Sequence, residues 1–290
     1  MSTIGIDIGA TKINFVLLKN RKIVKFWKIL TPKNKKELIN CLRSQVKQWG
    51  EASGIGIGVP SPLNQKRDLI LNPPNLKCLR NTPLARIIQR EIKSDSHLEK
   101  VTVALENDVN CFTLGEAIMG AGKRAKIVFG ITLGSGVGGG IVIDGKIYRG
   151  AFGGAAEVGH QTIKFDGQKC TCGSYGCFEE YCSERFFIRK GNLPIKFQRK
   201  AEKGDKKVLK IYNEYGRYLG IGLSNVINFL DPEVIVIGGG IANAYQFFIK
   251  EAKKEIKKRA ISPISKKNVK IKKAELGDFS GAIGAALLIK

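Results

Sequence analysis

The sequence is short of several features, and each shortage excludes a class of protein. Acidic residues are few, since 25 Asp and Glu stand against 49 Lys and Arg and the formal net charge is +24. No apolar run approaches the roughly 18 residues that span a bilayer. Asp7 and Lys12 interrupt the early apolar stretch where a signal peptide would have its core. We therefore expect a soluble, cytoplasmic protein without a membrane segment.

The excess of basic charge predicts attraction to polyanions, such as nucleic acid, an anionic membrane or phosphorylated substrates. The basic residues are scattered along the chain and are densest in residues 250–273. A solvated, lysine-rich helix face explains that segment more simply than a nucleic-acid patch does. Nucleic acid is therefore not the expected partner, although the charge does not exclude it.

Histidine is scarce, with two in 290 residues, and the seven cysteines are an odd number. Unevenly clustered cysteines in a chain of this length are typical of a metal site in a reducing compartment rather than of a disulfide framework. His160 precedes Cys170, Cys172 and Cys177, and one imidazole with three thiolates completes a tetrahedral zinc site that has no open position. We expect structural zinc there; the alternative is free cysteines beside a core histidine. His97 is expected at the surface.

The chain is long enough to bury a large core, and strands alternate with helices along it. Residues 3–29 predict a β-meander with a turn at Asn20-Arg21, and residues 126–150 repeat the pattern of strand, glycine-rich turn, strand, Asp-Gly turn and strand. Residues 60–83 and 150–183 predict irregular structure. The other expected elements are strands at 55–59, 101–105 and 234–237, and helices at 38–49, 84–92, 110–119, 208–229, 244–259 and 281–289.

This order of elements predicts an α/β protein in which a mixed-sheet architecture is built twice. The expected domains are a small N-terminal one of residues 1–110, to which residues 275–290 return, and a larger one of residues 111–274. The larger domain carries the zinc cluster. Two similar halves imply a cleft between them.

Three glycine-rich turns point to a nucleotide. In Asp7–Thr11, glycine lets the backbone approach a phosphate and Asp7 is placed to hold Mg²⁺; the alternative is a plain hairpin turn. Gly134–Gly140 formally contains G-x-G-x-x-G, but a strand follows it rather than a helix, which excludes a dinucleotide fold. Gly238–Gly240 follows a strand and would admit a flat adenosine. Two glycine-rich hairpins suit a clamp on nucleotide phosphates.

The segment Glu106-Asn107-Asp108 follows an expected strand and precedes an expected helix. An acid at the carboxyl end of a strand opens into a cleft, and a neighbouring amide can hold a hydroxyl, as a general base and its substrate require. The alternative is that Asp108 only caps the helix.

Together these motifs resemble the ROK family of sugar kinases and sugar-responsive repressors, in the actin-like ATPase superfamily. Asp7–Thr11 and Thr132–Gly140 are similar to its two phosphate motifs, Val236–Ala242 to its adenosine segment, Gly153–His160 to its sugar-binding signature and Cys170–Glu179 to its zinc-associated one. The resemblance covers nearly the whole chain, with the motifs in the right order.

The resemblance implies two similar actin-like, ribonuclease H-like domains with mixed sheets around a central cleft. The implied activity is ATP-dependent phosphorylation of a hexose, first of all glucose at its 6-hydroxyl, with Asp108 as general base and with Mg²⁺ and Zn²⁺ as metals. The implied partners are the hexose and the nucleotide, and a second copy of the chain in a homodimer or a higher homo-oligomer.

Site residues carry over one by one. Asn107, Glu157, His160 and Glu179 would join Asp108 in binding the sugar, His160 using one ring nitrogen for zinc and the other for a hydroxyl. The alternative for Glu157 and Glu179 is a role as surface carboxylates. The nucleotide would contact Asp7, Gly9, Ala10, Thr11, Lys12, Thr132, Gly134, Ser135, Gly136, Gly239 and Gly240.

Some positions depart from the family pattern. Ser61 replaces a glycine, Lys77-Cys78 replaces Pro-Trp, and Glu180 replaces a small residue. The first two positions flank the sugar, so the resemblance leaves the identity of the hexose open. The family's repressors carry a helix-turn-helix region before the first phosphate motif, and six residues precede Asp7 here. A non-catalytic sugar-binding regulator or a nucleic-acid-binding scaffold of the same fold is the alternative function.

Overall fold

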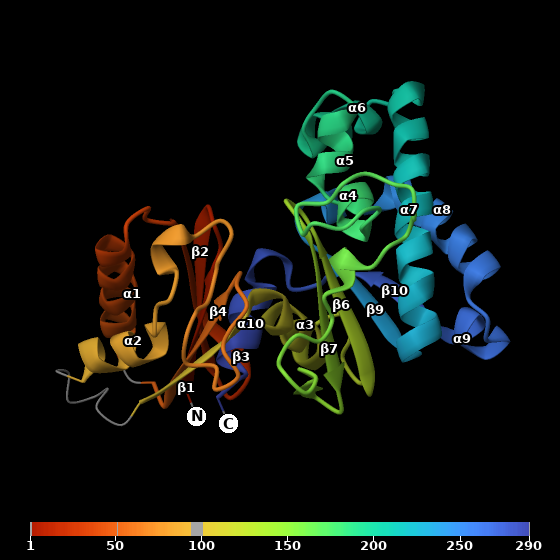
Figure 1. Ribbon diagram of the computed structural model, residues 1–290. Coiled ribbons are helices and arrows are strands. Elements are labelled where there is room, and N and C mark those ends of the chain that lie inside the picture. The colour runs from red at the N-terminus through yellow and green to blue at the C-terminus, as the bar shows by residue number, and fades with distance from the viewer. Residues whose placement is uncertain (1, 51, 94–100, 290) are drawn as a thin grey trace. The chain divides into compact units, whose positions relative to one another are not determined.

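The computed structural model describes residues 2–50, 52–93 and 101–289, and its contacts divide the chain into two compact units (Figure 1). Unit 1 comprises Met1–Arg124, Gly145–Ala155 and Glu275–Lys290, and unit 2 comprises Ala125–Asp144 and Ala156–Ala274. His97, expected at the surface, lies outside the described residues. The domain boundary expected after residue 110 stays a prediction.

Unit 1 is built on a mixed sheet with the strand order β3-β2-β1-β4-β5. The strands are β1 (Ser2–Ile8), β2 (Lys12–Lys19), β3 (Lys22–Leu30), β4 (Gly54–Val59) and β5 (Thr102–Asn107). The first three are antiparallel, whereas β1, β4 and β5 pair in parallel. The predicted meander is confirmed, and Asn20 and Arg21 at its turn have φ of 51° and 60°, as a two-residue turn between twisted strands requires.

Helices cover both faces of this sheet. α1 (Lys35–Trp49) and α2 (Leu84–Ile92) pack on one face, and α3 (Asp108–Met119) and α10 (Ser280–Ala286) lie on the other. Each predicted helix is confirmed within two or three residues, and α2 has the expected bounds. Asn34 caps α1 by accepting a hydrogen bond from the N–H of Glu37.

Two glycines allow α10 to lie directly on the strand backbones. A Cβ at Gly5 of β1 would lie 1.8 Å from Ala282 O, and one at Gly56 of β4 would lie 1.7 Å from Ala285 O. Any larger residue would push the helix away from the sheet. Glycine and isoleucine alternate in β1 and β4. The glycines therefore face α10, and the isoleucines, such as Ile4, fill the core on the opposite face of the sheet.

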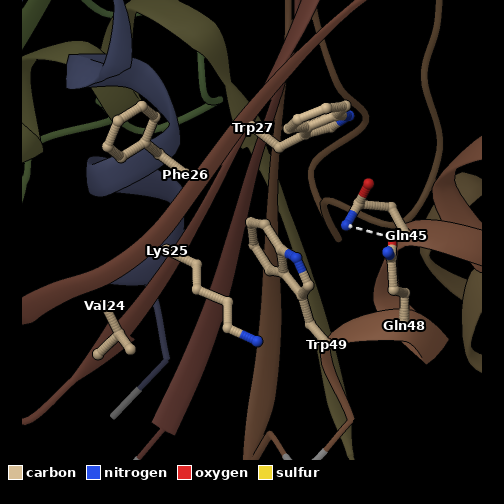
Figure 2. Close-up of a pocket in the computed structure, with 7 residues that line it drawn as sticks. All are labelled: Val24, Lys25, Phe26, Trp27, Gln45, Gln48 and Trp49. Carbon is tan, nitrogen blue, oxygen red and sulfur yellow. Dashed lines mark hydrogen bonds between the residues drawn. The ribbon is translucent and has the colours of Figure 1, made fainter.

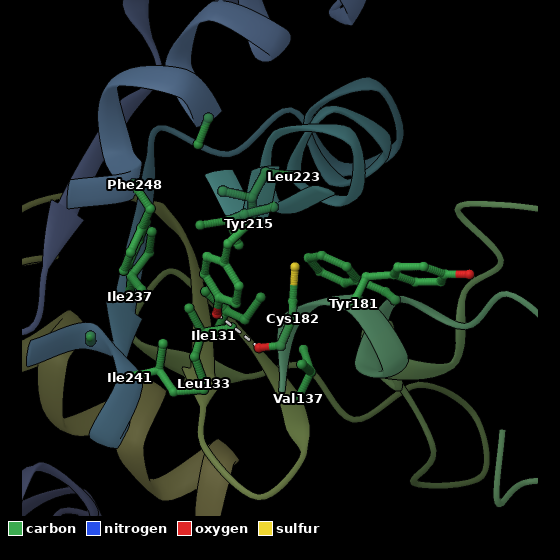
Figure 3. Packing of buried hydrophobic residues seen from close by; sticks show 14 of the residues in the cluster. Ile131, Leu133, Val137, Tyr181, Cys182, Tyr215, Leu223, Ile237, Ile241 and Phe248 are labelled. Carbon is green, nitrogen blue, oxygen red and sulfur yellow. Dashed lines mark hydrogen bonds between the residues drawn. The ribbon is translucent and has the colours of Figure 1, made fainter. Parts of the chain in front are cut away.

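Unit 2 contains strands in the order β10-β9-β6-β7, with β6 and β7 antiparallel and the other pairs parallel. They are β6 (Ile127–Leu133), β7 (Val137–Ile143), β9 (Val234–Gly238) and β10 (Lys270–Lys273). The long α7 (Lys206–Leu230) and α8 (Tyr245–Arg259) pack together beside this sheet. Figure 3 shows the core they share, in which Tyr215 Oη donates a hydrogen bond to Cys182 O at 2.8 Å.

The short elements complete the list. They are β8 (Lys146–Ile147), α4 (Phe178–Cys182), α5 (Glu184–Arg189), α6 (Pro194–Glu202), α9 (Pro263–Asn268) and 3₁₀ turns at Lys77–Leu79, Val158–His160, Gly240–Ala244 and Gly277–Phe279. The sequence did not predict α5, α6, α9 or β10, and α4 corrects the expectation that residues 150–183 are irregular throughout. The α/β class with two mixed sheets is confirmed. Within the described ranges, no helix combines the length and apolar character that crossing a membrane demands.

Candidate functional site

The first glycine-rich turn joins β1 to β2 in unit 1. The N–H of Gly9 donates to Lys12 O at 2.9 Å, and a Cβ at Gly9 would also lie 2.9 Å from that oxygen. Thr31 Oγ1 donates to Gly9 O at 2.7 Å and Lys33 Nζ to Ala10 O at 3.3 Å. The turn itself uses the N–H of Gly9, whereas the two side-chain bonds engage only carbonyl oxygens and leave N–H donors such as a bound phosphate takes. The turn is therefore braced in a way that is compatible with phosphate binding.

Asp7, at the end of β1, is close enough to Asp108 for the two charges to interact. Burial first, and then the negative charge of Asp108, raise the pKa of Asp7 to about 7, although a hydrogen bond with Asn14 acts in the lowering direction. A Cβ at Gly281 would lie 2.6 Å from Asp7 Oδ2, so the start of α10 also crowds this carboxylate. Two carboxylates that repel each other in a desolvated place are the donor set that a hard divalent cation prefers, so these residues fit Mg²⁺.

Asn107 and Asp108 lie where β5 ends and α3 begins. Asn107 is the N-cap, because its Oδ1 accepts hydrogen bonds from the N–H groups of Val109 and Asn110 at 2.9 and 3.1 Å. Asp108 is the first residue of the helix, and its Oδ1 accepts from Val109 N at 2.9 Å. Capping is therefore done by Asn107 rather than by Asp108. The helix N-terminus also favours the ionised form of a carboxylate beside it.

Glu106 belongs to the same segment, and the sequence analysis gave it no role of its own. It is fully buried, and its Oε1 accepts hydrogen bonds from Arg67 Nη2, from Asn107 N at 2.8 Å and from Asn110 Nδ2 at 3.0 Å. Its Oε2 accepts from Arg149 Nε at 2.8 Å. Two arginines from distant parts of the chain thus converge on the carboxylate that precedes Asn107. Burial lowers the pKa of Arg67, while the charge of Glu106 opposes that change.

In unit 2, the structure brings the second glycine-rich turn together with the third glycine cluster. Gly134 and Ser135, between β6 and β7, line a hollow of about 430 Å³ with Gly240 and Ile241, which follow β9. Gly239 has φ of 86°, and a Cβ there would lie 2.4 Å from Leu133 O. Thr132 is in β6 itself. The two segments predicted to bind a nucleotide therefore share one hollow.

Tyr212 of α7 lines the same hollow and was missed by the sequence analysis. Its side chain is fully buried, and within the described part of the chain its Oη has no hydrogen-bond partner. Burial raises the pKa of this phenol above its usual value, so the group stays protonated and can donate. Unpartnered buried hydroxyls are rare and costly. The hydroxyl is thus a ready donor for a ligand in the hollow.

The four predicted zinc ligands come together in unit 2. One ligand atom from each of His160, Cys170, Cys172 and Cys177 lies within 4.8 Å of the others. Cys172 Sγ is 3.6 Å from Cys177 Sγ, and Cys170 Sγ is 3.8 Å from His160 Nδ1. Two sulfurs about 2.3 Å from one tetrahedral zinc lie about 3.8 Å apart. The donor set and its spacing therefore fit zinc.

Two thiols of the cluster have pKa values shifted in opposite directions. Burial first, and then the hydrogen bonds and charges of Cys172 and Cys170, raise the pKa of Cys177 to about 12. Hydrogen bonds, first of all with the backbone of Ser174, lower the pKa of the exposed Cys172. Three thiols that crowd one another become thiolates together only when a cation offsets their repulsion. His160 presents Nδ1 to the sulfurs, which leaves Nε2 directed to a different partner.

The remaining predicted sugar ligands of unit 2 differ in their surroundings. Glu157 and His160 are exposed, whereas Glu179 is half-buried. Glu179 Oε2 accepts from Val137 N at 3.0 Å, and a Cβ at Gly136 would lie 2.5 Å from that oxygen. The second glycine-rich turn and the zinc-associated segment are thus in contact. Asn107 and Asp108 belong to unit 1.

Glu180, which departs from the family pattern, has a structural role here. It is buried, and it forms ion pairs with Arg185 and with Arg189 at 3.0 Å. Arg189 Nη2 also donates to Glu180 O. The carboxylate of Glu180 therefore belongs to a charged network with two arginines of α5, which a small residue at this position could not form.

The comparisons with known proteins agree with this geometry. The model of the ROK family matches residues 3–290. Glucokinase of Streptomyces coelicolor is 30% identical over 316 residues, covering 99% of this chain and 97% of that protein. The xylose repressor of Caldicellulosiruptor bescii is also 30% identical, with 99% of this chain and 78% of the repressor covered.

A solved structure gives the same answer for the fold. The crystal structure of a ROK family glucokinase from Streptomyces griseus in complex with glucose and AMPPNP is similar, with a TM-score of 0.84 and 29% identity. The match covers 100% of this chain and 99% of that chain. The resemblance deduced from the motifs is confirmed, and the chain belongs to the ROK family.

Proposed function

We propose that this protein is a sugar kinase that transfers the γ-phosphoryl group of ATP to the 6-hydroxyl of a hexose, with glucose as its main substrate. The proposal is supported by the similarity to glucokinases along the full chain, one of them in complex with glucose and AMPPNP. The observation that carries it is the pair of Asp7, on the first glycine-rich turn, and Asp108, at the start of α3.

In this proposal, Asp108 accepts the proton of the sugar's 6-hydroxyl as that oxygen attacks phosphorus. Asp7 would hold Mg²⁺, which supplies charge neutralisation of the phosphate oxygens when bound. The Nδ2 group of Asn107 would donate to a sugar hydroxyl, because its Oδ1 is engaged in capping α3. Phosphoryl transfer needs mainly in-line positioning and charge stabilisation, so these groups suffice in unit 1.

The nucleotide would be held by both glycine-rich turns. In unit 1 the phosphate contacts are assigned to Gly9, Ala10, Thr11 and Lys12. In unit 2 they are assigned to Thr132, Gly134, Ser135 and Gly136, and the adenosine to Gly239 and Gly240. The hollow shared by Gly134 and Gly240 supports this assignment because it has the size of a small-molecule site.

The sugar would also contact Glu157, His160 and Glu179. Zinc would be held by His160, Cys170, Cys172 and Cys177 as a structural ion, since all four positions are filled by protein. Cys170 also lies within 4.8 Å of Glu179 and Glu180. The zinc ligands would therefore orient two of the sugar ligands, one through Nδ1 of His160 and one through this contact.

The experiment is a coupled assay of ADP release by the purified protein with ATP and Mg²⁺, across glucose, mannose, fructose, N-acetylglucosamine and xylose. We expect sugar-dependent release that is fastest with glucose. A faster reaction with another hexose would correct the substrate and keep the kinase. Sugar binding in a thermal-shift assay without ADP release from any sugar would contradict the kinase.

One observation favours a second function, that of a non-catalytic sugar-binding regulator. The xylose repressor is as similar in sequence as the glucokinase is, and this chain covers 78% of it. Both carboxylates of the proposed reaction are present here, which a regulator does not need. We therefore place the kinase first and include xylose in the panel.

We further propose a homodimer in the cytoplasm, and folding domains of residues 1–110 together with 275–290, and of residues 111–274. Size-exclusion chromatography with light scattering tests the dimer, since a homodimer has twice the chain mass of 31.8 kDa. Limited proteolysis tests the domain boundary, because cleavage concentrates between independently folded parts.

A further inference from the structure

The kinase function does not account for the basic charge, and in one basic segment no acidic residue offsets that charge. Residues 8–36 contain nine Lys and Arg and no Asp or Glu. The segment includes β2 and β3, and β3 is the end strand of the unit 1 sheet. Among the described residues, β3 pairs only with β2. A strongly positive strand thus forms one edge of the unit.

The register of β3 shows which side its residues face. Trp27 is opposite Phe15 and Lys25 is opposite Leu17, and both of these β2 residues belong to the core beneath α1. Residues that are directly opposite in an antiparallel pair share a face of the sheet. Trp27 and Lys25 therefore lie on the α1 side, and both are exposed, Trp27 by 54%.

A register shift adds more positive charge to this face. The pairing of β2 with β3 shifts between Leu17 and Leu18, after which Lys22 is opposite Lys19. Leu17 and Lys19 are alternate residues of one strand and point to the same side. The bulge therefore gathers Lys19, Lys22 and Lys25 on the face that carries Trp27, whereas strict alternation along β3 would place Lys22 and Lys25 on opposite faces.

The face ends in a hollow of about 460 Å³ between β3 and the C-terminal end of α1. Figure 2 shows Trp27 and Lys25 of β3 with Trp49, Gln45 and Gln48 of α1 around it. Trp49 is braced edge-on against the buried ring of Phe15, with the ring centroids 6.2 Å apart. We name this surface, made by Lys19, Lys22, Lys25, Trp27, Gln45, Gln48 and Trp49, the indole groove.

We propose that the indole groove binds single-stranded nucleic acid, an activity beyond the proposed phosphorylation of a sugar. Accessible aromatic rings beside a line of cations are the means by which proteins hold single strands, since bases stack on the rings and phosphates lie along the cations. No residue that lines the hollow is acidic, and the amides of Gln45 and Gln48 offer donors and acceptors to base edges.

The combination of features selects a single strand over other polyanions. A duplex keeps its bases stacked on one another, so it would use the cations and leave the indoles unused. An acidic peptide would also satisfy the lysines, but it lacks the flat rings that two indoles accommodate. A free sugar would contact the indoles and the amides and would need none of the lysines.

Intrinsic fluorescence tests the proposal directly, because the chain has two tryptophans and both line the groove. The full chain is titrated with oligothymidylate or oligouridylate of about 12 nucleotides, within the range of known site sizes, and with a duplex of equal length. We expect quenching by the single strands and little by the duplex. The two oligomers decide between DNA and RNA as the source of the strand.

Variants complete the test, with binding followed by anisotropy of a labelled oligomer. Trp27→Ala should weaken binding by about tenfold or more, as loss of one stacked base does. Phe229→Ala is the control, because Phe229 is a 92% exposed aromatic residue of unit 2. Lys25→Gln should reduce the slope of log affinity against log salt by about 0.7, the value for one phosphate on a single strand. Sugar-dependent ADP release should be unchanged in all three variants.

Four results would overturn the proposal. They are unchanged affinity of Trp27→Ala, equal quenching by the duplex, displacement of the oligomer by polyglutamate with the same quenching, and quenching by glucose alone. The first two would reduce the binding to general charge attraction, the third would indicate an acidic protein partner, and the fourth a sugar site. If the wild-type protein proved to have no kinase activity, each of these results could still be interpreted, because none of the binding measurements depends on ATP.

Discussion

The two units begin with the same arrangement and use it for different chemistry. In each, a hairpin with a glycine-rich turn is followed by a strand that pairs in parallel with the first strand of the hairpin, as β2-β1-β4 in unit 1 and β7-β6-β9 in unit 2. The turn of unit 1 carries Asp7, whose pKa responds to Asp108. The turn of unit 2 opens on a hollow lined by Tyr212 and Ile241.

The difference shows that the chemistry available at a glycine-rich turn depends on the side chains around it rather than on the backbone of the turn. Unit 1 concentrates ionisable groups, since Glu106 pairs with two arginines and Asp7 lies near Asp108. Unit 2 supplies a cavity and a cluster of one histidine and three cysteines that could hold a metal ion. We therefore expect variants in unit 1 to change charge and proton transfer, and variants in unit 2 to change stability and ligand binding.

The largest expected effect is the loss of stability on removal of zinc, which should concern unit 2 and not unit 1. Cys170→Ser and Cys172→Ser should each release zinc and destabilise unit 2 by several kcal/mol, because binding energy of a structural ion is folding energy. That corresponds to a fall in Tm on the order of 10 °C. Differential scanning calorimetry and metal analysis measure both effects. Cys41→Ser, in α1 of unit 1, is the control and should keep its zinc; equal Tm in all three would contradict a structural zinc.

The second effect concerns catalysis in unit 1. Asp108→Asn should lower kcat by about 10²- to 10⁴-fold, the usual value of a general base, while glucose affinity stays within a few-fold. Steady-state kinetics and calorimetric titration of glucose measure the two quantities. Asp278→Asn removes an exposed carboxylate of the same unit that pairs with Lys28 and should leave kcat unchanged. Full turnover by Asp108→Asn would exclude Asp108 as the base.

The third effect concerns the buried carboxylate of unit 1. Glu106→Gln leaves Arg67 and Arg149 without their counter-charge and should cost about 3–5 kcal/mol of stability, as breaking a buried pair does. Urea denaturation measures the change. Glu91→Gln breaks the partly exposed pair with Arg43 and should cost about 1 kcal/mol or less. Similar losses in the two variants would show that the Glu106 network adds nothing beyond a surface pair.

The fourth effect is a pH dependence that belongs to unit 1. Asp7 has a pKa of about 7 in the folded protein and 3.8 as a free side chain, so between these values the unfolded chain binds fewer protons. The free energy of unfolding therefore falls as pH rises from about 4 to 7, by up to about 4 kcal/mol. Asp7→Asn should remove this slope in protein without Mg²⁺. Thermal melts at pH 5 and pH 7.5 in buffer without Mg²⁺ and without a chelator, so that zinc stays bound, compare the two proteins, and parallel curves would contradict the raised pKa.

The smallest effect concerns the hollow of unit 2. Tyr212→Phe removes an unpartnered buried hydroxyl and should stabilise the ligand-free protein by about 1 kcal/mol, while ATP protects it less against heat. Tyr245→Phe is the control, because Tyr245 Oη donates a hydrogen bond to Ile271 O at 2.9 Å. Loss of that hydrogen bond should destabilise the protein by about 1 kcal/mol, whereas Tyr212→Phe should stabilise it. Thermal shifts with and without ATP measure both. Destabilisation by Tyr212→Phe would mean that the hydroxyl has a partner after all.

Much of the fold was predictable because its signals are local. The alternating pattern before Lys19, the turn residues Asn20 and Arg21, and the apolar spacing of residues 84–92 each fix an element from neighbours in sequence. The glycine motifs and the spacing of Cys170, Cys172 and Cys177 likewise mark the candidate site within short segments.

The features that escaped prediction depend on contacts far along the chain. Helix α6 has few apolar residues and is held by Phe197, whose ring packs 5.5 Å from that of Phe187. Strand β10 buries Ile271 between lysines that look like a solvated face. Glu106 shows its role only once arginines 39 and 43 residues away reach it. Composition and periodicity carry no trace of such pairings.

The glycine faces of β1 and β4 also have a consequence for the order in which the protein is made. Residues 280–286 close the unit 1 sheet against Gly5 and Gly56, yet the ribosome delivers them after all of unit 2. Unit 2, whose residues run from 125 to 274, is therefore complete while the first sheet still lacks its covering helix. Synthesis thus completes the half that carries the proposed zinc ligands before α10 emerges, and the carboxylate beside α10 is assembled only afterwards.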